Sequence, residues 1–196
     1  MQLFDVAIVG GGPAGSSCAA FCAIAGLQSL VLEREKFPRE KVCGDCLNPS
    51  CWPVLERLEL AEGVRDLPHS KLSTVEFISI DGRGVTVELP TGADGEISVK
   101  RSLFDDLLLT RARELGANVH EQTTVTGLYR NEHWNIETAS GDFFQTRILI
   151  GADGRNSTVA HLCNLLPRPA RERVALQAHI SLPRDFGNRM TIEQQT

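Results

Sequence analysis

Residues 3–15 read Leu3-Phe-Asp-Val-Ala-Ile-Val9-Gly10-Gly-Gly12-Pro-Ala-Gly15, an apolar run that leads directly into a cluster of glycines. The run is rich in β-branched residues and predicts a strand over Leu3–Val9 that is buried on both faces of a parallel sheet. Small and apolar residues predict a helix over Pro13–Ala25, ended by Gly26. Gln28–Leu32 predicts a second buried strand. This strand–turn–helix–strand order predicts a Rossmann-type βαβ unit.

The glycines follow the pattern Gly10-x-Gly12-x-x-Gly15. In such a turn the first glycine permits the tight bend, the second lets the backbone approach a pyrophosphate, and the third allows close helix packing. The helix N-terminus attracts phosphates, and Glu33 ends the next strand, where it can accept hydrogen bonds from ribose hydroxyls. The alternative is a glycine turn that binds nothing. The predicted cofactor contacts here are Gly10, Gly12, Pro13, Ala14, Gly15, Glu33 and Arg34.

A second motif, Gly151-Ala-Asp153-Gly154, follows another predicted buried strand and leads into Ser157-Thr-Val159. It resembles the second FAD motif of the class A flavin monooxygenase and geranylgeranyl reductase superfamily. The resemblance implies that Asp153 and Gly154 lie beside the flavin pyrophosphate and ribityl chain. The alternative is a turn that caps the following helix.

Two further segments carry the same resemblance. Lys41-Val-Cys43-Gly-Asp45-Cys-Leu-Asn-Pro49 is similar to the Lys-x-Cys-Gly-x-x-Leu-x-Pro segment of geranylgeranyl-reductase-like members. Arg101 matches an arginine that approaches the flavin cofactor, although it also fits a solvated charge at a helix N-terminus. Cys43 and Asp45 are the candidates for facing the flavin ring, but a loop cap or a core thiol explains them almost as well. By this resemblance the remaining cofactor contacts are Lys41, Arg101, Val125, Asp153 and Gly154.

The resemblance also implies an activity. NAD(P)H would reduce the bound FAD, and the reduced flavin would then hydrogenate an alkene such as a prenyl chain or activate dioxygen for hydroxylation of a small molecule. The Lys-x-Cys-Gly segment favours the reductase branch. Two departures from the family pattern put this activity in doubt. After the Ser-x-Val of the second motif, family members usually have an arginine, whereas this chain has Ala160. Family members are also longer, with a later Gly-Asp motif and a complete substrate domain. A catalytically silent FAD-binding fragment is therefore the alternative.

The expected fold is α/β, a Rossmann-like FAD-binding domain of glutathione-reductase type over 1–165, with the beginning of an incomplete substrate-binding domain over 166–196. An antiparallel β ribbon over about 72–100 interrupts it, built from Thr74–Ile80, Gly84–Leu89 and Glu96–Lys100. Helices are predicted over Pro49–Leu60 and 101–115. The remaining predicted strands begin at Val119 and include Thr124–Tyr129, Trp134–Ala139, Asp142–Ile150, Arg173–Leu182 and Arg189–Glu193.

The cysteines allow a competing interpretation. Cys46-Leu-Asn-Pro-Ser-Cys51 resembles the redox-active segment of pyridine-nucleotide disulfide reductases, and thiols at a helix N-terminus have a lowered pKa. Those enzymes carry a second dinucleotide fingerprint, which residues 155–196 lack. A zinc site from Cys43, Cys46 and Cys51 would lack a fourth ligand, so no metal is expected. Most of the six cysteines are expected to be free thiols, with Cys18 and Cys22 as core residues.

Composition excludes several classes of partner. The net charge is −5 and no basic run is present, which argues against nucleic acid. The mean hydropathy is −0.11, and the apolar start is too short to cross a bilayer and has no features of a signal peptide. We therefore expect a cytoplasmic protein without a transmembrane segment, making peripheral membrane contact only if its substrate is a lipid.

Overall fold

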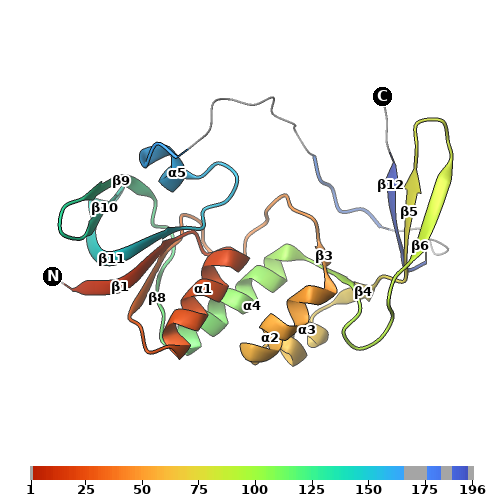
Figure 1. Ribbon diagram of the computed structural model, residues 1–196, viewed down its shortest axis with the longest axis horizontal. Coiled ribbons are helices and arrows are strands. Elements are labelled where there is room, and N and C mark those ends of the chain that lie inside the picture. The colour runs from red at the N-terminus through yellow and green to blue at the C-terminus, as the bar shows by residue number, and fades with distance from the viewer. Residues whose placement is uncertain (1, 166–175, 182–186, 194–196) are drawn as a thin grey trace. The chain divides into compact units, whose positions relative to one another are not determined.

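The computed structural model describes residues 2–165, 176–181 and 187–193 (Figure 1). The chain divides into two compact units, each discontinuous in sequence. Unit 1 combines Met1–Glu40 with Ser102–Arg173, and unit 2 combines Lys41–Arg101 with Val174–Thr196. The expected boundary at residue 165 lies between a cofactor-binding domain and a substrate-binding domain. It does not coincide with the division into two units, and it stays a prediction.

Unit 1 contains a six-stranded sheet in the order β8-β2-β1-β11-β10-β9. At its centre β1 (Leu3–Val9) runs parallel to both of its neighbours, β2 (Ser29–Leu32) and β11 (Phe143–Gly151). A third parallel pairing joins β2 to β8 (Asn118–His120). The other edge is an antiparallel meander of β9 (Val125–Arg130), β10 (Trp134–Thr138) and β11. The predicted α/β arrangement and the predicted meander are both confirmed.

The core of unit 1 lies on the two faces of β1 and β2. Ala7, Ile8, Leu30 and Val31 have no solvent exposure, as expected for strands covered on both sides. Helix α1 (Pro13–Ile24) contacts both strands through the small residues Gly15, Ser16, Ala19 and Ala20. The remaining helices of unit 1 are α4 (Arg101–Glu114), whose first residue belongs to unit 2, and the short α5 (Thr158–Leu162).

Unit 2 contains two three-stranded sheets, which corrects the predicted single ribbon. β5 (Thr74–Ile78) and β6 (Gly84–Glu88) pair antiparallel as expected, and β12 (Arg189–Glu193) joins β5 in parallel. The third predicted ribbon strand, β7 (Ile97–Val99), instead pairs with β3 (Cys46–Leu47) and β4 (His69–Lys71). The physical reason is burial: Ile97 and Val99 are at most 3% exposed, whereas every residue of β6 is exposed.

Two other expectations in unit 2 hold only in part. The helix predicted over Pro49–Leu60 is a 3₁₀ turn (η1, Pro49–Cys51) followed by α2 (Trp52–Arg57). Glu59 breaks it with a φ of 57°, and a further helix, α3 (Ala61–Asp66), follows. Within the predicted strand Arg173–Leu182, the described residues 176–181 form no strand, whereas the prediction of Arg189–Glu193 is confirmed.

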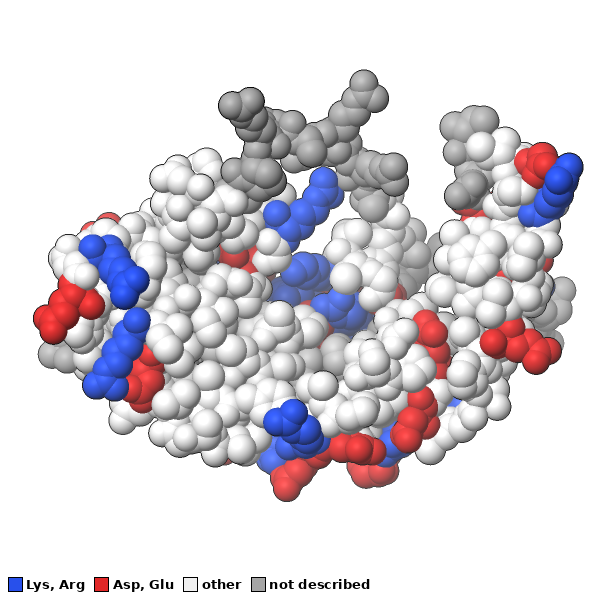
Figure 2. Space-filling model, viewed as in Figure 1, with Lys and Arg blue, Asp and Glu red and all other residues white. Residues whose placement is uncertain are grey.

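Acidic and basic side chains lie next to one another on the face shown in Figure 2. Elsewhere in the described chain, charged side chains form ion pairs, such as Arg113 with Glu121, whose Nη2 and Oε2 atoms are 2.6 Å apart. Among the described residues, no helix is both long enough and apolar enough to cross a membrane.

Candidate functional site

The two predicted cofactor motifs meet at the carboxyl ends of β1 and β11. The N–H of Ala152 donates to the carbonyl of Val9 at 2.8 Å, and the N–H of Gly10 donates to Leu32 at 2.8 Å. Gly10 has a φ of 103°, and a Cβ atom there would lie 2.5 Å from the carbonyl oxygen of Ala152. A glycine is therefore required at position 10 both by the backbone conformation and by the approach of the second loop.

Gly15 brings helix α1 against the turn that precedes it. A Cβ atom on Gly15 would overlap with the carbonyl oxygen of Gly10 and would lie 3.2 Å from Cγ2 of Ile8. The neighbouring Ser16 is fully buried, and its hydroxyl donates to the carbonyl of Gly11 at 2.7 Å. The close packing predicted for Gly15 is thus present. No sequence motif pointed to Ser16, whose hydrogen bond links the glycine turn to helix α1.

The start of α1 contains two of the predicted cofactor contacts, Gly12 and Pro13. Gly12 is its N-cap residue, Pro13 follows, and no side chain caps the helix. A Cβ atom on Gly12 would meet only one described atom within 4 Å, Nη2 of Arg39 at 3.5 Å. No side chain caps the N–H groups of the first turn, and a helix N-terminus of this kind attracts anions. Ala14 is exposed in that turn.

Glu33 is held in place under the glycine turn. It is 5% exposed, and its Oε2 accepts the N–H of Gly11 at 2.6 Å while Oε1 accepts the N–H of Glu35 at 2.9 Å. A carboxylate offers about four lone-pair sites, so these two bonds leave capacity for ribose hydroxyls. The next residue, Arg34, points to solvent and lies 3.6 Å from Glu35, so no contact in the structure assigns it to the cofactor.

Asp153 caps helix α5, which is the alternative role that the sequence left open. Its Oδ1 accepts the Ser157 hydroxyl at 2.6 Å, and its Oδ2 accepts the N–H of Val159 at 3.1 Å. Gly154 follows with a φ of 86° and is exposed. These two hydrogen bonds of Asp153 hold the Gly151–Gly154 loop, whose residue Ala152 lies against Gly10. A contact of Asp153 with the cofactor stays a prediction.

The remaining predicted cofactor residues are distributed over both units. Val125 is 5% exposed and packs in the hydrophobic core with Phe4 and Ile136, so its side chain is occupied there. Lys41 is exposed and Arg101 is buried, and both belong to unit 2. Their contributions to the cofactor site stay predictions.

Unit 2 holds a second polar arrangement, around the loop that contains Cys43 and Asp45. Nε2 of His179 lies 2.8 Å from Oδ2 of Asp45, and the amide of Gln177 donates to the same oxygen at 3.2 Å. Gln177 also accepts the N–H of Cys43 at 3.1 Å. His179 is therefore oriented by a carboxylate, as an acid–base histidine is in many enzymes. Sequence analysis missed this pair because its members are 134 residues apart.

The structure contradicts a lowered pKa for the thiol at the centre of the disulfide alternative. Burial, together with the negative charges of Glu96 and Asp45, raises the pKa of Cys46. Its Sγ lies 3.6 Å from Sδ of Met190, and both Cys46 and Cys51 are free thiols. Among the described residues, no three potential ligands are grouped as a metal site.

Cys18 and Cys22 differ from their predicted place in the core, since both are only partly buried. Partial burial, with the neighbouring Cys18, raises the pKa of Cys22 to about 11. We expect iodoacetamide at pH 8 to label the exposed Cys43 faster than Cys22 or Cys46, because the thiolate is the reactive form. Peptide mass spectrometry over a time course measures the three rates. Faster labelling of Cys46 would restore the disulfide interpretation.

Comparison with known proteins gives consistent matches. Residues 4–184 match the family described as FAD binding domain. A digeranylgeranylglycerophospholipid reductase from Methanocaldococcus jannaschii is 32% identical over 172 residues, covering 84% of this chain and 41% of that protein. A menaquinone reductase from Mycolicibacterium smegmatis is 31% identical over 189 residues, covering 92% and 45% respectively. The solved structure of CmlS, a flavin-dependent halogenase, has a TM-score of 0.72 and 30% identity, covering 84% of this chain and 32% of that one. The chain thus spans less than half the length of each of these proteins.

Proposed function

This chain belongs to the FAD binding domain family, and on that premise we propose that it binds FAD at the glycine turn and forms the cofactor-binding part of an NAD(P)H-dependent oxidoreductase. The observation that carries the proposal is the meeting of Gly10 with the loop Gly151–Gly154. The uncapped N-terminus of α1 and the buried carboxylate of Glu33 lie next to this contact, at the carboxyl ends of the strands, where ligands of such folds bind.

The residues present fit this cofactor. The N–H groups at the start of α1 would bind the diphosphate, and Glu33 would accept the ribose hydroxyls of the adenosine half. By the family resemblance, Asp153, Gly154, Lys41 and Arg101 would contribute to the flavin half, within the glutathione-reductase type of architecture. The bound flavin supplies the hydride chemistry, while the protein orients the ring and excludes water.

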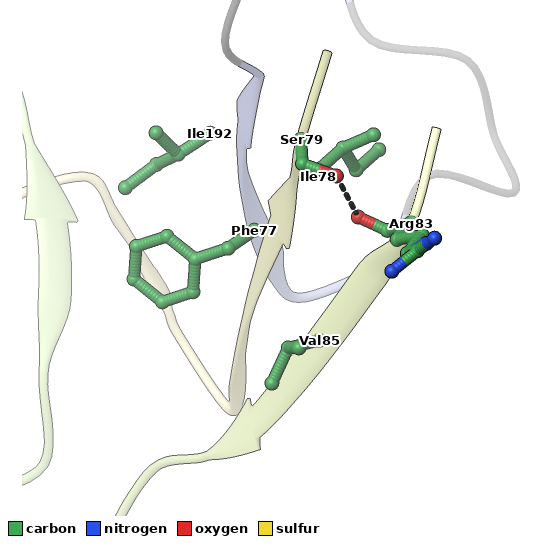
Figure 3. Close-up of a pocket in the computed structure, with 6 residues that line it drawn as sticks. All are labelled: Phe77, Ile78, Ser79, Arg83, Val85 and Ile192. Atoms are coloured by element: carbon green, nitrogen blue, oxygen red, sulfur yellow. Dashed lines mark hydrogen bonds between the residues drawn. The ribbon is translucent and has the colours of Figure 1, made fainter. Parts of the chain in front are cut away.

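The structure of unit 2 favours an apolar substrate. Phe77 lies between Val85 and Ile192 on three neighbouring strands, and all three side chains are more than 40% exposed (Figure 3). With Ile78, Ser79 and Arg83 they line a hollow of about 250 Å³. An exposed apolar row of this kind fits a hydrocarbon chain better than a polar aromatic substrate. It therefore supports alkene reduction on a prenyl-type substrate over hydroxylation, as does the similarity to a protein named as a phospholipid reductase.

We further propose that His179, held by Asp45, delivers the proton in such a reduction. Reduction of an alkene would add a hydride to one carbon and a proton to the other, and a histidine hydrogen-bonded to a carboxylate is a suitable group to hold and donate that proton. The placement of the Cys43–Asp45 loop beside the flavin ring rests on the family resemblance alone. A disulfide reductase would instead need a reactive Cys46, and the raised pKa of that thiol argues against it.

The absorption spectrum of the purified chain tests the proposal. After FAD addition and desalting, we expect a retained flavin spectrum with bands near those of bound FAD, and bleaching on anaerobic addition of NADPH. Retained flavin that NADPH or NADH fails to bleach would limit the chain to cofactor binding. Loss of all flavin on desalting would support the silent-fragment alternative.

A further inference from the structure

Arg39 is a buried cation next to the glycine turn that neither the sequence motifs nor the family resemblance assigns. Its side chain is only 10% exposed, and its guanidinium lies 4.6 Å from the centre of the Phe37 ring. Nη1 lies 3.2 Å from Oδ2 of Asp105, a residue of α4 whose side chain is fully buried. Burying an arginine in this way is costly unless its charge is balanced and its donors are used.

The donors of Arg39 are not all used. Nη1 is buried and has no hydrogen-bond partner among the described residues, despite its proximity to Asp105. Nη2 is the atom that lies against Gly12, 3.5 Å from the position that a Cβ atom there would occupy. The guanidinium therefore reaches the N-cap of α1, where the N–H groups of the first turn also lack a capping side chain. The guanidinium of Arg39 and the N-terminus of α1 both contribute positive potential at this point. Asp105 balances the charge of Arg39, whereas no side chain caps the helix N-terminus.

We propose that Arg39 is a direct ligand of the diphosphate of the bound dinucleotide, and that Asp105 holds it ready for that contact. A guanidinium presents a planar set of donors that matches phosphate oxygens and keeps its charge at every physiological pH. Asp105 offsets the charge while the site is empty, so that the arginine tolerates burial. This inference rests on the proposed function, because it names a further residue of the same cofactor site.

Adenine nucleotide titrations test the assignment, since ADP carries the diphosphate and adenosine does not. By isothermal titration calorimetry, Arg39→Gln is expected to weaken ADP binding by about 10- to 100-fold and to leave adenosine binding unchanged. Arg39→Lys is expected to recover part of the loss, because it restores the charge without the planar donor set. The matched control is Arg147→Gln, which removes an exposed arginine paired with Asp5 near the other end of β1.

The outcomes separate this proposal from the proposed function. If the wild-type chain binds neither ADP nor FAD, both fail. If it binds ADP and Arg39→Gln binds ADP equally well, only the role of Arg39 fails. Equal losses of ADP and adenosine binding would also overturn it, because Arg39 would then support the fold of the turn rather than the phosphates.

A second variant keeps the test decisive if Arg39→Gln does not fold. Asp105→Asn removes the negative charge that balances the buried guanidinium of Arg39. The diphosphate of added ADP would then supply a negative charge in its place. Saturating ADP is therefore expected to raise the Tm of Asp105→Asn by more than it raises the Tm of the wild type. An equal or smaller increase, measured by thermal unfolding followed by circular dichroism, would contradict the proposal.

Discussion

Replacing Gly10 with alanine is expected to lower the free energy of unfolding by about 2–5 kcal/mol and to abolish FAD retention. A residue with a side chain at a φ of 103° costs about 1–2 kcal/mol. The new Cβ atom would also lie 2.5 Å from the carbonyl oxygen of Ala152, and relieving such overpacking costs about 1–3 kcal/mol more. The shift would displace the Gly151–Gly154 loop from the cofactor edge. Urea unfolding and the flavin spectrum after desalting measure the two effects.

Gly26 provides the matched control for this substitution. It also has a positive φ, 75°, but a Cβ atom there would meet nothing within 4 Å. Gly26→Ala is therefore expected to cost only the conformational part, about 1–2 kcal/mol, with FAD retained. If both substitutions lower the free energy of unfolding equally and neither releases FAD, the contact between the two motif loops has no role in the site.

Replacing Glu33 with alanine is expected to weaken FAD binding by at least about 10-fold. The carboxylate would be lost both to the ribose hydroxyls and to the buried N–H of Gly11, and each bond to a charged group contributes about 1.5–3 kcal/mol. Titration of FAD into the protein, followed by flavin fluorescence, measures the affinity. The matched control is Glu35→Ala, which removes an exposed carboxylate but keeps the backbone N–H that donates to Glu33.

Ribose recognition and support of the glycine turn are distinguishable at Glu33. If Glu33 binds the ribose 2′-hydroxyl, the wild-type protein binds adenosine more tightly than 2′-deoxyadenosine, and Glu33→Ala binds the two equally. If Glu33 only holds the N–H of Gly11, both ligands lose the same factor and the preference persists. The second result would remove Glu33 from the set of cofactor contacts.

The elements around the glycine turn could be predicted from the sequence because their causes are local. The uninterrupted apolar runs of β1 and β2 require burial on both faces, and this burial is observed. Glycines at positions 10 and 15 occur where side chains would overlap with neighbouring backbone. The family resemblance came from short motifs for the same reason, since each motif lies within about ten consecutive residues.

Predictions failed where the partner of a segment is distant in the chain. The run Glu96–Lys100 has the pattern of a ribbon strand, but β7 pairs with β3 and β4 because Ile97 and Val99 are buried there. The cysteine motif suggested reactive thiols, yet burial and neighbouring carboxylates raise the pKa of Cys46. In both cases the local pattern was compatible with two environments, and the packing of other segments selected one.

The amino-acid sequence alone therefore determined the βαβ unit and its glycine turn, because these depend on residues close together in the chain, and its short motifs carried the family resemblance that implies FAD. Only the tertiary structure placed the Ala152 loop against Gly10, Arg39 between Gly12 and Asp105, and His179 on Asp45. These contacts join segments separated by 27 to 142 residues, and no local pattern records which charges will meet. The physical reason is that burial, hydrogen bonding and charge compensation depend on which groups the folded chain brings together.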